Sequence, residues 1–277
     1  MAIGVSSVPQ MPDIKGIENF KGEKIHSGYF KSGKPYQNKN VLVFGTGTSS
    51  HDVSQDLHAN GANVTMVQRS PTMIVNLEPS AQLPYALYQE GPSTDDCDLI
   101  AISSPLSVLK KTHQILTKQS KKLDSKLLKK LEKIGFVLDY GEDNTGWQFK
   151  YLTRGGGYYF NVGASNLVAD QKIKLIQFSD IKEFLSDGII HNSKKLEYDS
   201  FIFATGYKGQ EYMVKKFFGN EVANKVGRIW NFNSKKQELN NMFVKTNQQG
   251  LWFIAGSLAQ CRIFSKYLSF QISKELK

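Results

Sequence analysis

The sequence has little cysteine and no long apolar run. Its 277 residues contain two cysteines, Cys97 and Cys261, whose separation matches no metal-binding or redox motif. Nothing therefore indicates a disulfide-stapled secreted protein, and a reducing, cytoplasmic location is expected. No segment approaches the roughly 20 apolar residues of a membrane-spanning helix, and the N-terminus lacks a basic start followed by an apolar run. We expect no transmembrane segment.

The sequence also lacks the residue patterns of metal sites and of nucleophilic catalysis. Its five histidines show no metal-ligand spacing, and no serine, histidine and aspartate set stands in a nucleophile-elbow context. Asp139, Glu142 and Asp143 fit no calcium-loop spacing, so we interpret them as a solvated loop. We therefore expect no metal, and the catalytic residues are unknown.

Much of the positive charge lies in one segment. The formal net charge is +10, and nine lysines fall between Lys110 and Lys133. Leucines and isoleucines recur there at near-helical spacing, which predicts one or two amphipathic helices over about residues 104–135. Because no aromatic residues lie among the lysines for base stacking, we interpret them as a solvated helix face and expect no nucleic-acid partner.

A strand, a glycine turn and a helix follow one another at residues 41–60. The apolar run VLVF leads into GTGTSS, and residues 51–60 can form a helix that Gly61 stops. In a dinucleotide-binding turn the first glycine permits the tight bend, and the second lets the backbone approach a pyrophosphate at the helix N-terminus. Ser50 takes the third position, where a small residue is needed. Gly45, Gly47 and Ser50 are the predicted pyrophosphate contacts, and Thr48 and Ser49 are further predicted cofactor-binding residues of the same turn.

The next predicted strand, at residues 63–68, ends in a cation. An NAD site would place an acidic residue there for the ribose hydroxyls, whereas this chain has Arg69 followed by Ser70. An arginine suits a 2′-phosphate, so the pattern favours NADP(H). The alternative is an ordinary glycine turn followed by a surface arginine.

Several further motifs occur in a fixed order. FKGEKIHSGYF at residues 20–30 carries Phe20, Gly22, His26 and Phe30 in an F-x-G-x-x-x-H-x-x-x-aromatic pattern. It is followed by QRSPT at 68–72, YLTRGGGYYFNVGAS at 151–165, FIFATGY at 201–207 and GLWFIAGSLAQCRIFSK at 250–266. Together these segments resemble the flavin-containing monooxygenases and Baeyer–Villiger enzymes.

The resemblance implies an α/β fold, with a doubly wound, three-layer, Rossmann-like NADP domain inserted in an incomplete FAD domain. It implies an NADPH- and FAD-dependent monooxygenase that transfers oxygen through a flavin peroxide to a small organic substrate. Thr205, Gly206, Gly256 and Ser257 would lie beside the flavin. The motif of residues 20–30 would link the two domains, with His26 either sensing nucleotide or making a structural hydrogen bond.

The resemblance also predicts the domain organisation. Residues 1–36 would be a linker and FAD-domain remnant, 37–195 the NADP domain with its helical insertion, and 196–277 the C-terminal part of the FAD domain. Short strands are expected at 172–178, 188–192, 196–198, 201–203 and 251–254.

One element of the family is missing. The first G-x-G-x-x-G turn, which holds FAD, has no counterpart, so we interpret the sequence as a truncated form in which FAD binding is in doubt. The alternative function is a nonenzymatic NADP(H)-binding module that has lost flavin binding. The sequence leaves a homo-oligomer open.

Overall fold

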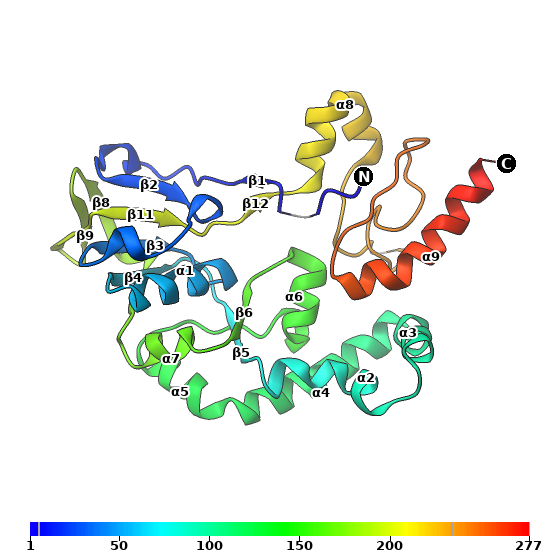
Figure 1. The fold of residues 1–277 in the computed structure, drawn as a ribbon, viewed down its shortest axis with the longest axis horizontal. Coiled ribbons are helices and arrows are strands. Elements are labelled where there is room, and N and C mark those ends of the chain that lie inside the picture. Colours follow the sequence, from blue (N-terminus) through cyan, green and yellow to red (C-terminus); the bar gives the residue numbers. More distant parts are fainter. Residues whose placement is uncertain (5, 234, 277) are drawn as a thin grey trace.

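A five-stranded parallel sheet forms the centre of the fold (Figure 1). The protein is described from a computed structural model that covers residues 1–4, 6–233 and 235–276. The strand order is β2 (Glu23–His26), β11 (Ser200–Phe203), β3 (Asn40–Phe44), β4 (Asn63–Gln68) and β7 (Lys174–Gln177). The central strands β3 and β11 are nearly continuous apolar runs, as expected for strands that are covered on both faces.

Alternate side chains of these strands enter two different cores. Val41, Val43 and Ile202 pack on one face with the helices α1 (Thr48–Ala59) and α7 (Ala164–Ala169). Leu42 and Phe203 pack on the other face. That face is covered by a small antiparallel sheet of β8 (Ile181–Leu185), β9 (Gly188–His191) and β10 (Lys194–Glu197). The result is the predicted Rossmann-like α/β arrangement in three layers.

A helical insertion lies beneath the sheet in Figure 1. It connects β5 (Met73–Asn76) to β6 (Tyr158–Asn161), which pair in parallel. Its helices are α2 (Ala86–Glu90), α3 (Thr94–Ser103), α4 (Leu106–Leu123), α5 (Ser125–Lys133) and α6 (Gly146–Arg154). The helices expected over 104–135 are confirmed as α4 and α5. The sequence did not predict α2 and α3.

The C-terminal residues form a separate apolar cluster. It contains α8 (Gln210–Val226), the loops up to Gly256 and α9 (Leu258–Glu275), and Met1 packs against it. Two short strands, β1 (Val8–Pro9) and β12 (Tyr207–Lys208), pair antiparallel and connect this cluster to the central sheet. None of the described helices is long and apolar enough to cross a membrane.

The predicted strand at residues 251–254 is wrong. It forms isolated hydrogen bonds with Met1, Phe243, Thr246 and Gln248 but no ladder with a partner strand in the described residues. The Met1 amino group donates to the Trp252 carbonyl, and the Ile254 N–H donates to the Met1 carbonyl at 3.0 Å. An apolar run becomes a strand only where a partner strand supplies a ladder.

Two strands of the sheet come from outside residues 37–195. β2 belongs to the range interpreted as a linker, and β11 to the range interpreted as the C-terminal FAD part, yet β11 lies between β2 and β3. The sequence interpretation therefore placed the strand at 201–203 in the wrong sheet. An apolar parallel strand has the same pattern in any buried sheet, so its neighbours cannot be read from its residues. The other domain boundaries stay a prediction.

Candidate functional site

Several predicted site residues lie at one edge of the parallel sheet. In the strand register Phe203 is paired with both His26 and Phe44, and Phe44 is paired with Val67. The carboxyl ends of β2, β11, β3 and β4 therefore share one edge, and the segments that follow them lie together. In open parallel sheets this edge is where ligands bind.

The turn after β3 is built around Gly45 and Ser50. Gly45 has φ +122°, and a Cβ on it would lie 2.6 Å from the Ala204 carbonyl oxygen, so β11 leaves no room for a side chain. Ser50 is fully buried and donates a hydrogen bond to the Gly45 carbonyl at 2.5 Å. The serine in the third position thus closes the turn as well as being small.

Gly47 differs from Gly45, because among the described residues, apart from its chain neighbours and the backbone of α1, no atom lies within 4 Å of the position that its Cβ would take. It precedes α1, whose first residues Thr48 and Ser49 are exposed. Thr48 donates its hydroxyl to the Tyr158 carbonyl at 3.1 Å, which ties the helix start to β6. The first N–H groups of a helix have no intrahelical partner and carry a partial positive charge. An anion can therefore approach the backbone at Gly47.

Arg69 and Ser70 are exposed directly after β4. Gln68, which precedes them, is buried, and its side-chain amide binds the backbone of Val137 twice. Its Nε2 donates to the Val137 carbonyl at 2.9 Å, and its Oε1 accepts from the Val137 N–H at 2.8 Å. Gln68 therefore fixes the backbone from which Arg69 extends into solvent.

Two buried threonines connect the glycine turn to the segment after Arg69. Thr46 Oγ1 lies 2.7 Å from Thr72 Oγ1, within hydrogen-bond distance, and both side chains are buried. These residues and Gln68 were not among the predicted site residues, since small polar residues in a turn carry no distinctive signal by themselves. Their contacts hold the glycine turn and the segment after Arg69 at a fixed separation.

His51, also missed, lies directly behind the turn. Its Nδ1 is 3.1 Å from the Gly47 carbonyl, and its ring stacks on Tyr159 with a centroid distance of 4.0 Å. Burial lowers the pKa of His51 to about 4, although its hydrogen bonds to backbone carbonyls act in the opposite direction. The ring is therefore neutral at pH 7 and serves as a packing element under the turn.

His26 connects β2 to the turn after β11. Its Nδ1 accepts from the Gly28 N–H at 3.0 Å, which leaves Nε2 to donate to the Gly206 carbonyl at 2.9 Å. Burial lowers the pKa of His26, against the effect of the Gly206 hydrogen bond. His26 therefore makes the structural hydrogen bond that was one of its two expected roles.

The other motif residues attach the same segment to the core. The Phe20 ring stacks on Phe201 at 3.6 Å, and Phe30 packs on the ring of Tyr36 at 6.0 Å. A Cβ on Gly22 would lie 2.6 Å from the Asp199 carbonyl oxygen. The motif of residues 20–30 thus holds β2 against β11.

The residues expected beside a flavin fall into two groups. Thr205 donates to the Gln10 carbonyl at 2.6 Å, and Gly206, with φ +82°, has open space where its Cβ would be. Gly256 and Ser257 lie instead against α6 and Trp230. A Cβ on Gly256 would lie 2.3 Å from Gln260 Oε1 and 3.0 Å from the Tyr151 hydroxyl.

The start of α9 is already capped by the protein. The Ser257 hydroxyl accepts from the Gln260 N–H, and the Gln260 side chain accepts from the Ser257 N–H, both at 3.2 Å. The Gln260 amide also accepts from the Tyr151 hydroxyl at 2.7 Å. Gly256 is therefore small because side chains of this chain fill the adjacent space.

The acidic loop and the glycine run have structural contacts. Asp139 pairs with the buried Lys150; burial raises the pKa of Asp139, but the hydrogen bonds from Lys150 and Gly141 outweigh it and lower the pKa. Gly155 ends α6 in the left-handed conformation. Among the described residues no group of histidine, cysteine or acidic side chains could hold a metal.

Part of the chain matches a known family, and most of the chain is similar to known monooxygenases. Residues 1–89 match the family model of pyridine nucleotide-disulphide oxidoreductases. The chain is 33% identical over 214 residues to the probable indole-3-pyruvate monooxygenase YUCCA3 of Arabidopsis thaliana, covering 75% of this chain and 43% of that protein. It is 27% identical to indole-3-pyruvate monooxygenase YUCCA1 of Oryza sativa subsp. japonica, covering 75% and 46%.

Solved structures share the fold. The cyclohexanone monooxygenase from Rhodococcus sp. Phi1 bound to NADP+ superposes with a TM-score of 0.52 at 18% identity, covering 78% of this chain and 47% of that chain. The chain spans less than half the length of the curated relatives and of this structure.

Proposed function

Because this chain belongs to the flavin monooxygenase and Baeyer–Villiger-like family, we propose that it binds NADP(H) at the sheet edge formed by the Gly45–Ser50 turn and Arg69. The observation that carries the proposal is the open position at Gly47. Gly45 is a glycine because protein atoms crowd it, whereas no residue that the structure describes crowds the Cβ position of Gly47. A backbone left bare at a helix N-terminus suits a pyrophosphate.

Arg69 supports the choice of NADP(H) over NAD(H). It is exposed at the end of β4, makes no ion pair with any described residue, and follows a glutamine that fixes its backbone. A free guanidinium at this place can form charge-assisted hydrogen bonds with a 2′-phosphate. In NADH the corresponding hydroxyl carries no charge to attract it.

We further propose that this chain takes part in the reaction of its family, an NADPH- and FAD-dependent monooxygenation of a small organic substrate, as the part that binds the nucleotide. When both groups are bound, the nicotinamide supplies a hydride and the flavin supplies the redox and oxygen chemistry. The residues of this chain would bind and orient the nucleotide. His26 would contribute by holding Gly206, which has open space beside it, at the sheet edge.

One observation favours the alternative of an NADP(H)-binding module without flavin. Gly256 and Ser257 are occupied by the protein's own groups, so the N-terminus of α9 is not free for a second ligand. The sequence also supplies one G-x-G-x-x-S turn, which we assign to NADP(H). Of the positions expected beside a flavin, Gly206 then has open space beside it, whereas the Thr205 hydroxyl is bonded to the Gln10 carbonyl.

The nucleotide assignment is tested by titrating NADPH and NADH into the wild-type chain, Arg69→Ala and the control Arg228→Ala, which removes an exposed arginine far along the chain. We expect wild type and Arg228→Ala to prefer NADPH by roughly ten- to a hundredfold, the value of a hydrogen bond to a charged group. Arg69→Ala should lose that preference and keep its NADH affinity. Equal wild-type affinities for the two nucleotides would refute the assignment.

A separate experiment distinguishes the oxygenase from the binding module. The chain is incubated with excess FAD and desalted, and retained flavin absorbance and NADPH-driven oxygen uptake are measured. We expect NADPH binding with little retained flavin and little oxygen uptake. Stoichiometric flavin with steady oxygen uptake would instead establish the chain as a working oxygenase.

A further inference from the structure

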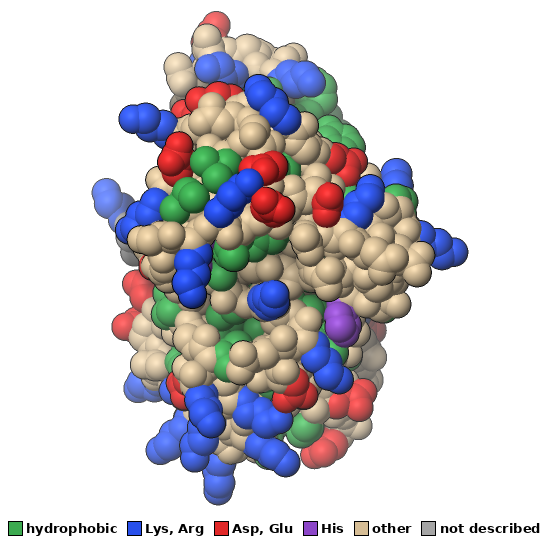
Figure 2. Space-filling view, turned by 90° about the vertical axis from the view of Figure 1, so that its left-hand side faces the viewer, with side chains coloured by type: hydrophobic (Ala, Val, Ile, Leu, Met, Phe, Trp, Pro, Cys, Tyr) green, Lys and Arg blue, Asp and Glu red, His purple; other side chains and the backbone are tan. Residues whose placement is uncertain are grey.

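The lysine-rich helices concentrate the charge of the molecule. The 18 residues of α4 hold five lysines and no acidic residue, and α5 adds four lysines and one glutamate. Residues 106–133, which include Asp124 between the helices, therefore carry +7 of the formal net charge of +10. Figure 2 shows basic side chains gathered at the lower end of the molecule, where Figure 1 places α5.

Five residues of α4 face solvent in a single line, which we call the α4 stripe. They recur at alternating spacings of three and four, so they share one side of the helix. Every member of the stripe is exposed: Val108, Lys111, Ile115, Lys118 and Lys122. The opposite side of α4 is buried through His113, Thr117 and Ser120.

The stripe mixes charge with unusually exposed apolar side chains. Ile115 is 67% exposed and Val108 is 49% exposed, and Leu123, beside the stripe, is also 49% exposed. A helix that only needs solubility would place polar residues at these positions. Lysines that flank exposed apolar side chains on an outward helix face can meet anionic headgroups while the apolar side chains enter the headgroup boundary.

The lysines of the stripe have no partner within the described chain. Among their neighbours, Lys110 lies 3.8 Å from Asp143 and Lys130 lies 2.9 Å from Asp170. No such ion pair involves Lys111, Lys118 or Lys122 in residues 1–4, 6–233 and 235–276. Their charge is therefore available to an external anion.

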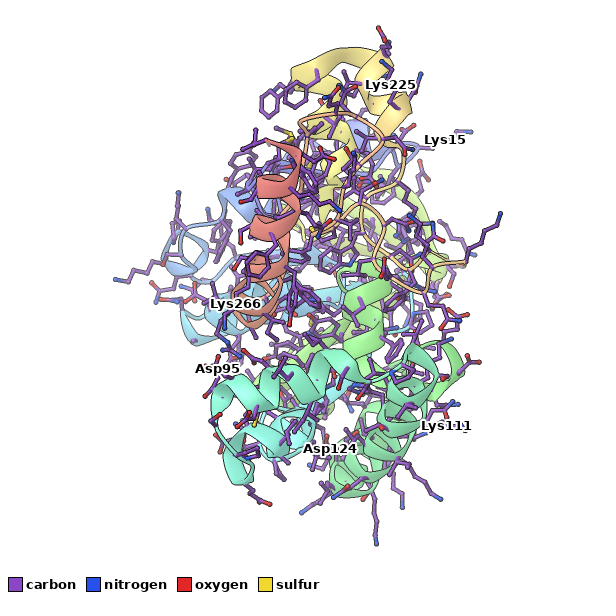
Figure 3. The ribbon with its side chains drawn as sticks, turned by 90° about the vertical axis from the view of Figure 1, so that its right-hand side faces the viewer. Lys15, Asp95, Lys111, Asp124, Lys225 and Lys266 are labelled. Carbon is purple, nitrogen blue, oxygen red and sulfur yellow. The ribbon has the colours of Figure 1, made fainter. Side chains whose placement is uncertain are left out.

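The one acidic residue between the two helices is turned inward. Asp124 is buried and accepts hydrogen bonds from the Asn76 N–H at 3.0 Å, the Asn76 side chain at 2.8 Å and the Ser80 hydroxyl at 2.7 Å (Figure 3). Its charge does not neutralise the outer face. The same contacts fix the junction of α4 and α5 to β5, so the lysines are presented on a rigid support.

We propose that the α4 stripe, with the exposed lysines of α5, docks on the surface of an anionic phospholipid bilayer. The lysines match the phosphate and carboxylate headgroups in charge, and Ile115 and Val108 enter the headgroup boundary. Nucleic acid fits less well, because no aromatic residue lies in the stripe to stack on a base. This docking goes beyond the proposed nucleotide binding, since its residues lie outside that site.

The test is sedimentation of the full chain with phosphatidylcholine vesicles that contain or lack phosphatidylserine, at low and high salt. We expect binding only to the vesicles that contain phosphatidylserine, weakened by salt. Each lysine near such a surface contributes about fivefold in partitioning, so the triple variant Lys111→Ala, Lys118→Ala, Lys122→Ala should bind about a hundredfold more weakly. Circular dichroism checks that each variant is folded.

Two controls separate docking from bulk charge. The triple variant Lys31→Ala, Lys182→Ala, Lys194→Ala removes the same charge from exposed positions elsewhere and should bind like wild type. Ile115→Gln should weaken binding severalfold, whereas Phe217→Gln, at a position that is 56% exposed on α8, should not. Binding of a single-stranded oligonucleotide is measured in parallel.

Three results would overturn the proposal. The first is equal loss of binding in the two triple variants, which would show an effect of net charge alone. The second is wild-type binding by Ile115→Gln, which would remove the apolar contribution. The third is binding of the oligonucleotide without binding of vesicles, which would assign the lysine face to nucleic acid.

Discussion

Arg262 of α9 donates two hydrogen bonds, at 2.9 and 2.5 Å, to the Asp98 carboxylate of α3, a residue 164 positions earlier in the chain. The Tyr88 hydroxyl donates to the same carboxylate at 2.9 Å. The Arg262 hydrogen bonds lower the pKa of Asp98, with burial acting against them. This contact attaches the C-terminal helix to the helical insertion, two parts that the sequence does not relate.

We expect Asp98→Ala to loosen α9, because it leaves the Arg262 guanidinium and the Tyr88 hydroxyl without their shared acceptor. Hydrogen–deuterium exchange of residues 258–275 should become faster, and the urea midpoint should fall. The matched control is Asp95→Ala on the same helix, which removes only the exposed pair with Lys266 at 3.1 Å (Figure 3). Exposed pairs contribute little. Equal exchange in the two variants would show that Asp98 does not hold α9.

A second prediction uses the different surroundings of the two turn glycines. Gly47→Val should keep the fold and abolish NADPH binding, because its side chain enters open space needed by the ligand. Gly45→Val should destabilise the protein itself, since its side chain would meet the Ala204 carbonyl and its φ of +122° disfavours a β-branched residue. Urea unfolding and NADPH titration of both variants distinguish the effects. A folded Gly47→Val chain with unchanged NADPH affinity would refute the pyrophosphate assignment.

The glycine turn could be predicted from the sequence because its determinants are local. The strand, the glycines and the helix all lie within residues 40–60. A tight turn between such a strand and helix requires a glycine at position 45 and a small residue at position 50. Arg69 could be predicted for the same reason, since it directly follows the next strand. Local order also located the helices between residues 104 and 135.

The contacts that hold this site could not be predicted, because they join distant residues. Gln68 binds Val137 across 69 positions, and Thr46 meets Thr72 across 26. The same limitation explains the misplaced strand β11, whose neighbours β2 and β3 precede it by more than 150 residues. The apolar residues of a strand indicate that the strand is buried. They do not indicate which strands lie beside it, because that depends on how the whole sheet is assembled.

A third prediction concerns Gln68 as a positioning residue for Arg69. Gln68→Leu should leave the Val137 N–H without its acceptor, whereas the Val137 carbonyl still accepts from the Thr72 N–H at 3.2 Å. An N–H group left buried and unpaired costs about 1 to 3 kcal/mol of unfolding free energy. Gln68→Leu should also weaken NADPH binding more than NADH binding, because the backbone that carries Arg69 is no longer fixed. The KD ratio of the two nucleotides is therefore measured together with the urea midpoint.

The control for Gln68 is Gln177→Leu. Gln177 donates to Gln68 Oε1 at 3.1 Å, but its removal leaves both Gln68 hydrogen bonds to Val137 in place. We expect this variant to keep the wild-type nucleotide preference. If Gln68→Leu also kept that preference while losing stability, Gln68 would be a structural residue with no effect on Arg69.

The last prediction is a loss of stability between pH 6.5 and 4 that comes from buried neutral histidines. Burial lowers the pKa of His51 and of His113 from 6.5 to about 4. In that pH window the unfolded chain binds a proton at each histidine and the folded chain does not, so stability is fully present above 6.5 and falls as the pH falls towards 4. Each histidine adds a slope of at most about 1.4 kcal/mol per pH unit.

The slope is measured from urea unfolding of the wild type at several pH values across this window, and His113→Leu and His51→Phe each remove one of the two titrating groups. His113 makes an edge contact with Phe149 at 5.5 Å, so a leucine keeps an apolar contact there, and a phenylalanine at position 51 keeps the stack on Tyr159. Each variant should lose part of the slope, whatever its stability at pH 7. Parallel curves for the wild type and both variants would show that the two rings titrate alike in the folded and unfolded chains. A slope that remained in this window would then be assigned to His26, whose pKa burial also lowers, because Asp98 and Asp139 lose their contributions only below about pH 4.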